Sequence, residues 1–320
     1  MGKGKKLLAV GAVAIGAFAV EQIIHGYHDV MGRYSDFNSI LGKIGNKSST
    51  DALSDYHKFL EEKRVWIRQQ NTEYVSITSD RGDRLQGYLT YPEEESKVFV
   101  LGLHGYHANH DYDPAAFTQY YVEGRGYNFL NVDHVASGDS EGRYVGFDFF
   151  ESQDSLKWLD YLIDRFGDDI RIIIHGVSMG GATVCKMVDS VPPQVKLAIA
   201  DCPFTNALEE FDNTAKNFGL KNPEPLLKVF NAMNKVFAGY DLNDTDNRES
   251  VKNSKVPMLF VHGDADDFVP TRMGEELYEL CGNEKELLIV PGAEHAQSIS
   301  TDEALYHKTL DAFIDKYLGE

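Results

Sequence analysis

Short apolar runs alternate along most of the chain with longer segments in which apolar residues recur every three or four positions. The runs have the length of buried β-strands, and the longer segments have the spacing of amphipathic helices. Strands that alternate with helices predict a mostly parallel sheet with helices on both faces. The expected strands include 97–103, 171–177, 256–263 and 284–290, and the expected helices include 149–166, 180–189, 273–280 and 302–317.

Two parts of the chain depart from this alternation. Residues 26–70 form a polar connector, in which Leu53, Tyr56, Phe59 and Leu60 share one face of a helix that we expect to dock on the main domain. Between 204 and 255 two helical segments, 206–217 and 225–237, replace the strand pattern. The second segment has more apolar residues than one exposed helix needs, which predicts an inserted helical cap.

The amino terminus is a basic, then apolar, segment. Lys3, Lys5 and Lys6 precede residues 7–20, which are all apolar or glycine. Positive charge before an apolar run is typical of export segments. Residues 1–25 are therefore expected to be a signal or membrane anchor, with the catalytic domain outside the cell.

The fate of this segment is open. Ala17-Phe-Ala19 resembles a cleavage site, after which the protein would be secreted, whereas Ile23 and Ile24 lengthen the apolar run. We favour an uncleaved anchor that contacts the membrane through residues 7–24. A short helix packed on the soluble domain is disfavoured, because the many small residues would pack weakly.

The most informative motif surrounds Ser178, which has Gly176 and Gly180 two positions away on either side. It follows a β-branched apolar run and precedes a helical pattern. In a sharp strand-to-helix turn, a Cβ at either glycine would collide with neighbouring backbone. Such a turn presents the serine hydroxyl at the carboxyl edge of the sheet, above the positive end of the next helix. Ser178 is therefore the candidate nucleophile.

A nucleophilic serine needs a base and an acid that orients the base. Asp264, Asp266 and Asp267 follow the expected strand 256–263, and His295 follows the strand 284–290. The order serine, aspartate, histidine suits an elbow of this kind. His295 is the candidate base and Asp266 the candidate acid, although spacing does not exclude Asp264 or Asp267.

The loop after strand 97–103 contains His104-Gly105-Tyr106-His107. A glycine there lets the loop turn beneath the serine, so that the backbone N–H groups of Tyr106 and Met179 act as oxyanion donors. His104, His107 and His110 also suggest a metal site. Three-residue spacing chelates well on a helix but not on a loop, so we expect no metal and a structural role for His104.

With these motifs in place, the chain resembles an α/β-hydrolase, and in particular bacterial membrane-anchored serine hydrolases related to the S33 aminopeptidase-like and bile-acid thioesterase-like families. Further matching pieces are 75–82 with 85–89, 131–133 with 138–142, 200–204 and 262–270. The likeness covers about residue 60 to the end. It implies an eight-stranded, mostly parallel sheet with a helical cap at about 204–255, in a hydrolase domain of residues 71–320.

By the same resemblance, Ser178, Asp266 and His295 match the catalytic triad, and Tyr106 and Met179 match the oxyanion donors. Val135 and Ala136 stand where the family usually has Arg-Gly. This departure puts in doubt how the loop packs against the floor of the site.

The composition of the chain indicates the number of domains and disfavours one class of binding partner. The 320 residues are 42% hydrophobic, enough for one large domain, and the net charge of −19 disfavours nucleic acid. Cys185, Cys202 and Cys281 form no Cys-x-x-Cys pair and are expected to be buried thiols.

We therefore expect an exported or membrane-anchored serine hydrolase that cleaves a small acyl ester or peptide-like substrate without a cofactor. The cap is expected to form an apolar acyl pocket. Three alternatives stay open: aminopeptidase or amidase activity, with Glu209, Glu210 or Asp212 holding a substrate amine; thioesterase or acyltransferase activity; and a non-catalytic binding module.

Overall fold

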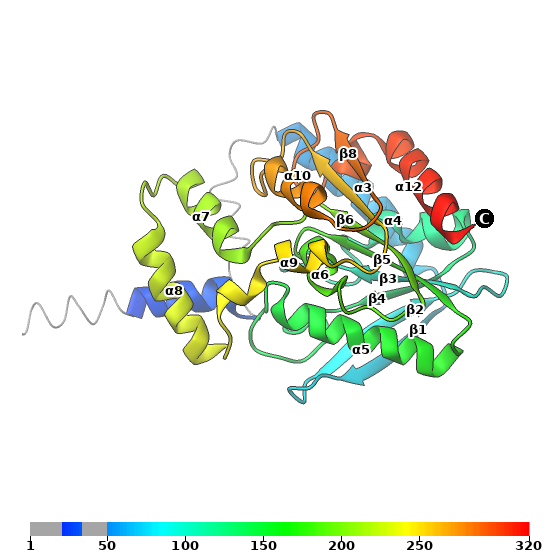
Figure 1. Ribbon diagram of the computed structural model, residues 1–320, viewed down its shortest axis with the longest axis horizontal. Helices are drawn as coiled ribbons and strands as arrows, with labels where there is room; N and C mark the ends of the chain where they lie inside the picture. Colours follow the sequence, from blue (N-terminus) through cyan, green and yellow to red (C-terminus); the bar gives the residue numbers. More distant parts are fainter. Residues whose placement is uncertain (1–20, 34–49, 320) are drawn as a thin grey trace, which may run out of the picture.

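The computed structural model describes residues 21–33 and 50–319, without the side chains of residues 50–55. Its centre is a single eight-stranded sheet with the strand order β1-β2-β4-β3-β5-β6-β7-β8 (Figure 1). β1 pairs with β2 and β2 with β4 in antiparallel fashion, and every later pair is parallel. This is the mostly parallel α/β-hydrolase sheet that the sequence predicts.

The parallel strands are almost continuously apolar because helices cover both faces of the sheet. The strands are β1 (Thr72–Thr78), β2 (Arg84–Thr90), β3 (Val98–Leu103), β4 (Asn128–Val132), β5 (Arg171–Val177), β6 (Val195–Asp201), β7 (Met258–Gly263) and β8 (Lys285–Val290). Since parallel strands all end at the same edge, the loops after β3, β5, β7 and β8 meet there.

Two hydrophobic clusters lie on opposite faces of the sheet. On one face pack α5 (Phe149–Phe166), α6 (Met179–Met187), α9 (Arg248–Lys252) and α10 (Thr271–Leu280); on the other pack α3 (Thr50–Arg68), α4 (Ala115–Gln119), η1 (Tyr120–Gly124) and α12 (Glu303–Leu318). The short helix α11 (Ser298–Thr301) precedes α12. The expected helices 149–166, 273–280 and 302–317 thus agree with the structure to within two residues.

The connector helix docks as expected. Tyr56 and Leu60 of α3 are buried in the second cluster, and Phe59 packs against it. Leu53, the fourth residue of the predicted face, lies outside the described side chains. Arg64 and Arg68 on the same helix form ion pairs with Asp111, which fastens α3 to the loop after β3.

The predicted cap consists of α7 (Ala207–Asn217) and α8 (Glu224–Phe237), followed by η2 (Leu242–Thr245). Asn206 caps α7, where its side chain accepts hydrogen bonds from the backbone N–H groups of Leu208 and Glu209. In Figure 1 the two cap helices stand apart from the sheet, beyond its carboxyl edge. A third cluster joins the cap to the loops beneath it.

Residues 21–31 form a helix that packs on the domain, drawn in dark blue beside α8 in Figure 1. We call it the N-terminal helix. The Tyr27 side chain is fully buried, and its hydroxyl donates to Asn234 Oδ1 of α8 at 3.0 Å. The boundary expected at residue 25 therefore falls inside one helix, because Tyr27 and Met31 share its buried face.

No helix in the described part of the chain is long and apolar enough to cross a membrane. The expected membrane contact spans residues 7–24. Of these, 7–20 lie outside the described residues, and 21–24 begin the N-terminal helix.

Candidate active site

The turn around Ser178 is a strained strand-to-helix elbow. β5 ends at Val177, Ser178 has φ 56° and ψ −118°, and α6 begins at Met179. A Cβ on Gly176 would collide with the Gly180 carbonyl oxygen, and one on Gly180 with that of Leu103. A non-glycine residue rarely adopts a positive φ, so the surrounding packing imposes this conformation on the serine. The crowding expected at both glycines is present.

The His295 imidazole contacts both of the other candidate catalytic side chains. His295 Nε2 lies 2.9 Å from Ser178 Oγ, and His295 Nδ1 lies 2.7 Å from Asp266 Oδ2. The other Asp266 oxygen accepts hydrogen bonds from the backbone N–H groups of Phe268 at 3.0 Å and Val269 at 2.9 Å. The acid is thus held by the chain that follows it, and it fixes the ring that faces the serine.

The rival aspartates do not contact His295. Asp264 is exposed, and its carboxylate accepts from the Gly292 backbone N–H at 2.6 Å. Asp267 is also exposed, and its backbone carbonyl accepts from the Asn217 side chain at 2.9 Å. Of the three candidates, only Asp266 turns its carboxylate into the site.

Electrostatics couple the imidazole to this acid. Burial opposes charge on Asp266, but His295 and His262 outweigh it and hold the pKa of that carboxyl below its ordinary value. Burial likewise opposes charge on His295, yet the adjacent Asp266 carboxylate raises the pKa of the imidazole well above its usual range. At low pH the imidazole therefore carries a proton on both ring nitrogens, and Nε2 becomes a base toward Ser178 only as the pH rises.

The loop after β3 runs directly against the serine. The Gly105 backbone N–H donates to Asp113 Oδ2 at 2.7 Å, and a Cβ at Gly105 would lie 3.3 Å from Ser178 Cβ. Tyr106 follows at once. Met179 occupies the first position of α6, where backbone N–H groups have no partner inside the helix. The two expected oxyanion donors thus belong to segments that border Ser178.

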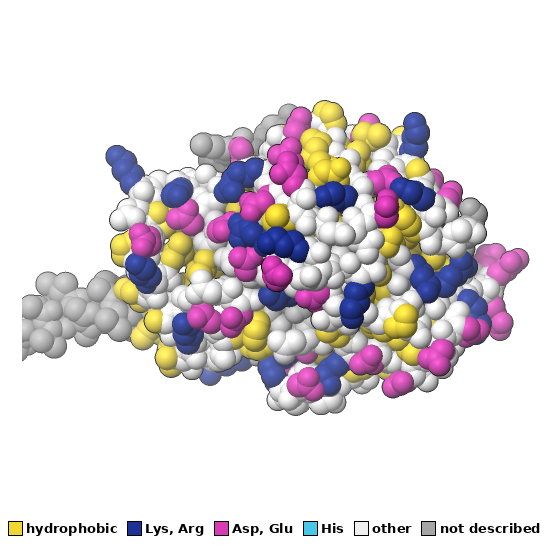
Figure 2. Space-filling model, viewed as in Figure 1, with side chains coloured by type: hydrophobic (Ala, Val, Ile, Leu, Met, Phe, Trp, Pro, Cys, Tyr) yellow, Lys and Arg dark blue, Asp and Glu magenta, His cyan; other side chains and the backbone are white. Residues whose placement is uncertain are grey.

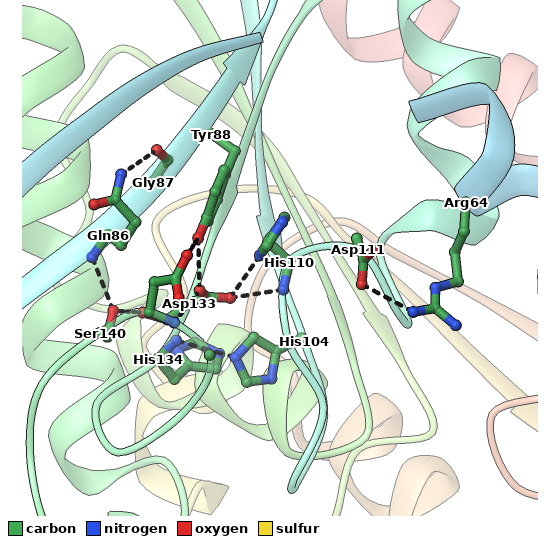
Figure 3. A network of polar contacts seen from close by, with 12 residues as sticks. Arg64, Gln86, Gly87, Tyr88, His104, His110, Asp111, Asp133, His134 and Ser140 are labelled. Carbon is green, nitrogen blue, oxygen red and sulfur yellow. Dashed lines mark hydrogen bonds and ion pairs between the residues drawn. The ribbon is translucent and has the colours of Figure 1, made fainter. Parts of the chain in front are cut away.

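His104 has the structural role that the sequence suggests. Its Nδ1 lies 2.7 Å from the Gly105 carbonyl oxygen, and its Nε2 accepts from the His134 backbone N–H at 3.0 Å (Figure 3). Burial lowers the pKa of His104, so the ring is neutral with its proton on Nδ1. His110 instead faces Asp133, with 3.0 Å between Nδ1 and Oδ1. His104 and His110 therefore have separate hydrogen-bond partners.

One group of side chains in the described ranges has the spacing of a metal site: Cys202, Asp266 and His295. The 2.7 Å contact between the carboxylate and the imidazole uses the atoms that a metal ion would need, so these residues fit a proton relay better. Burial raises the pKa of the Cys202 thiol to about 11, which keeps it protonated. All three cysteines are free and buried, as expected.

The loop with Val135 and Ala136 in place of Arg-Gly still packs tightly. Val135 joins the core, and Ala136 adopts φ 60°, the left-handed conformation that glycine would adopt most easily. Arg33, which follows the N-terminal helix, donates to the carbonyl oxygens of Gly138 and Ser140. A contact from outside the loop therefore fastens it.

An apolar cavity of about 420 Å³ lies over Ser178, a volume usual for small-molecule sites. Its walls come from α7, α8, the N-terminal helix and the loops below them. The aromatic side chains that line it include Tyr27, Phe147, Phe204, Phe211, Phe230 and Phe268. The expected cap pocket is present, and one of its walls is a helix that the sequence analysis assigned to other roles.

Sequence reasoning missed this wall. Gln22, Ile23 and Tyr27 line the cavity, and the Tyr106 hydroxyl donates to the Val30 carbonyl oxygen. The signal was present, because Ile23, Tyr27 and Val30 recur at the spacing of an apolar helical face. The apolar run of residues 7–20 before them is longer, and it is more typical of an export segment or membrane anchor.

Among the described residues that line the cavity, Glu210 is the one carboxylic acid. Its side chain is only 4% exposed; Thr214 donates to Oε1 at 2.7 Å, and Oε2 has no hydrogen-bond partner. Burial raises the pKa of Glu210 to about 8, so the acid is mostly neutral at pH 7. Glu209 and Asp212, the other cap acids singled out from the sequence, instead pair with Arg248 and Lys216.

The chain is similar to several known hydrolases and to uncharacterized bacterial proteins. A model described as the prolyl oligopeptidase family matches residues 150–320, just over half of the chain. The uncharacterized protein YqkD of Bacillus subtilis is 26% identical over 312 residues, which cover 97% of each chain. The lysophosphatidylserine lipase ABHD12 of Macaca fascicularis is 27% identical over 200 residues, 58% of this chain and 46% of its own.

Among solved structures, the Pyrococcus furiosus esterase Pf2001 is 23% identical, with a TM-score of 0.60 over 78% of this chain and 92% of its own. Its likeness concerns the fold. Together these matches support an α/β-hydrolase with a serine-hydrolase site. They do not extend to membrane anchoring or to the narrower S33-like and thioesterase-like resemblance.

Proposed function

The chain belongs to the prolyl oligopeptidase family, and we propose that it is an esterase that cleaves carboxylic esters with apolar acyl groups through an acyl-enzyme on Ser178. One observation carries this proposal. The Ser178 hydroxyl lies 2.9 Å from the His295 imidazole at the floor of a cavity whose walls are almost entirely apolar. A nucleophile and base in contact beneath such walls suit an acyl chain that extends away from the reacting carbonyl.

The mechanism follows from these contacts. Ser178 Oγ attacks the ester carbonyl carbon while its proton passes to His295 Nε2, and the Asp266 carboxylate stabilises the imidazolium that results. The backbone N–H groups of Tyr106 and Met179 hold the negative oxygen of the tetrahedral intermediate. His295 then returns the proton to the leaving oxygen, which departs as an alcohol.

Deacylation repeats these steps with water. His295 takes a proton from a water molecule, whose oxygen attacks the acyl carbon bound to Ser178. The ester bond to Oγ breaks, the proton returns to Oγ, and the carboxylic acid leaves.

We further propose, from the basic and apolar sequence of residues 1–20, that the protein is exported or anchored, with this site outside the cell.

A panel of p-nitrophenyl esters tests the acyl pocket. If each added methylene is buried, it contributes about 0.8 kcal/mol, or about fourfold in kcat/KM, until the cavity is full. We therefore expect kcat/KM to rise with acyl length from acetate and then to level off. Matched amides and thioesters in the same panel should react more slowly than the esters.

The control for this panel is a pair of substitutions on α7. Ala215 lines the cavity and Lys216 is exposed, so Ala215→Trp should abolish the preference for longer chains while Lys216→Trp keeps it. Acetate should react with both variants. Equal rates for all acyl lengths in the wild-type protein would contradict the proposed pocket.

The second candidate function is an aminopeptidase. The geometry of Glu210 favours it, because a buried carboxyl with one unpartnered oxygen could bind a substrate amine. The raised pKa of about 8 argues for the ester instead, since an amine partner should be met by an ionised acid. We expect Glu210→Gln to preserve ester hydrolysis within about threefold, because the neutral amide is close in shape to the neutral acid. Selective loss of turnover on substrates with a free amino terminus would support the aminopeptidase.

A further inference from the structure

Exposed apolar side chains are concentrated on one part of the molecule. Of the ten large apolar side chains exposed by 37% or more in the described part of the chain, seven belong to the N-terminal helix and the cap. We call them the apolar rim: Ile23, Phe218, Leu220, Leu226, Val229, Val236 and Phe237. Figure 2 shows hydrophobic side chains along the left edge of the molecule, over α8. Patches of this kind mark interaction sites more often than ordinary solvated surface.

The rim is continuous with the cavity over Ser178. Ile23, Phe218 and Leu226 are 38%, 43% and 43% exposed, and each also lines the cavity. Three residues of the rim therefore belong both to the exposed surface of the molecule and to the wall of the cavity over Ser178. A surface that served only to contact another folded protein would not need to open into the acyl site.

Lysines border the rim although the chain as a whole is acidic. Between residues 216 and 237 there are four lysines and one acid, Glu224, in a chain of net charge −19. On α8, Lys228 and Lys235 directly precede the exposed Val229 and Val236, and their side chains are 74% and 52% exposed. Their ion pairs with Glu224 and Asp241 are superficial and contribute little. Exposed apolar residues beside lysines are typical of helices that lie at a membrane interface.

The sequence before the rim has the same character. The N-terminal helix begins directly after residues 7–20, an apolar stretch that Lys3, Lys5 and Lys6 precede. An apolar segment beside lysines therefore occurs twice in the sequence, once in the cap and once directly before the N-terminal helix.

We propose that the apolar rim docks on an anionic lipid bilayer, and that an amphiphilic ester enters the cavity from the bilayer by sliding its acyl chain past Ile23, Phe218 and Leu226. This inference rests on the proposed esterase function and adds the source of the substrate. The valines of α8 contact the lipid, and the lysines beside them reach the headgroups.

The test compares two rates in the full-length protein. One is hydrolysis of a long-chain ester held in vesicles of phosphatidylcholine with phosphatidylglycerol, and the other is hydrolysis of soluble p-nitrophenyl acetate. In the variant Val229→Glu/Val236→Glu, neither substituted side chain lines the cavity, so hydrolysis of acetate should match the wild type. The ratio of the vesicle rate to the acetate rate should fall at least tenfold.

Val65→Glu is the matched control, because Val65 lies on α3 and is 46% exposed, close to the 45% of Val229. Its ratio should equal that of the wild type. In the wild type, replacing phosphatidylglycerol by phosphatidylcholine should also lower the ratio. If the ratio of the vesicle rate to the acetate rate is unchanged in the double variant, the proposal is wrong. This holds even if the variant differs from the wild type in self-association or stability, because that result would indicate that another copy or residues 7–20 cover the rim. Failure of the wild type to hydrolyse acetate would instead contradict the esterase function.

Discussion

Ser178→Ala should lower kcat on a short-chain ester by a factor of about 10⁴ or more, because it removes the hydroxyl that forms the acyl-enzyme. The fold should persist. Ser178 Oγ contacts His295 Nε2, and the backbone around the serine is held by Gly176 and Gly180, which the substitution leaves intact. Turnover and the thermal unfolding midpoint, measured on the same preparation, check both halves of this expectation.

The matched control is Ser137→Ala, which removes a hydroxyl from a buried serine on the loop after β4. It should retain most of the activity. If Ser178→Ala hydrolysed the ester at a rate close to that of the wild type, the nucleophile would have to be another residue.

Asp266→Asn should lower kcat by a factor of about 10³–10⁴, because an amide cannot stabilise the imidazolium and favours the wrong tautomer of His295. The substitution should also change the pH dependence. Burial lowers the pKa of His295 and the Asp266 carboxylate raises it, with a net rise well above the usual value. Removing the carboxylate therefore lowers that pKa, and the neutral base persists to more acidic pH.

The residual activity of Asp266→Asn should thus keep its plateau at lower pH than the wild type does, as profiles of kcat/KM against pH would show. Asp264→Asn serves as the control, since Asp264 is exposed and contacts Gly292 and not the imidazole. If Asp264→Asn caused the larger loss, or if the acidic limb of the profile moved to higher pH in Asp266→Asn, the assigned acid would be wrong.

The sequence predicted those elements whose conformation depends on neighbouring residues in the chain. The elbow could be recognised because only glycine fits at 176 and 180, and both positions are crowded by backbone in the structure. The helix 149–166 was predicted with its bounds because its apolar spacing is regular and Gly167, with φ 92°, ends it. The order of Ser178, Asp266 and His295 was informative because parallel strands all end at one edge of the sheet.

The sequence did not predict which individual side chains of distant segments contact one another outside the triad. The contact between Tyr27 and Asn234 joins residues 207 positions apart. The apolar spacing around Tyr27 indicates a buried face, but it does not indicate which distant segment covers that face. The choice among three neighbouring aspartates depends on backbone directions in one loop, which spacing does not encode. The sequence did not distinguish Glu210 from the other two cap acids, because an amphipathic pattern normally places acids in solvent. Glu210 is buried because its position on α7 faces the cavity.

The measurement that addresses the central claim most directly is covalent labelling with a fluorophosphonate, followed by peptide mass mapping. The wild-type protein should carry one adduct, on the peptide that contains Ser178, and His295→Ala should react far more slowly because the hydroxyl has lost its base. Ser178→Ala should carry none. An adduct on another residue, or labelling that persists in Ser178→Ala, would contradict the account.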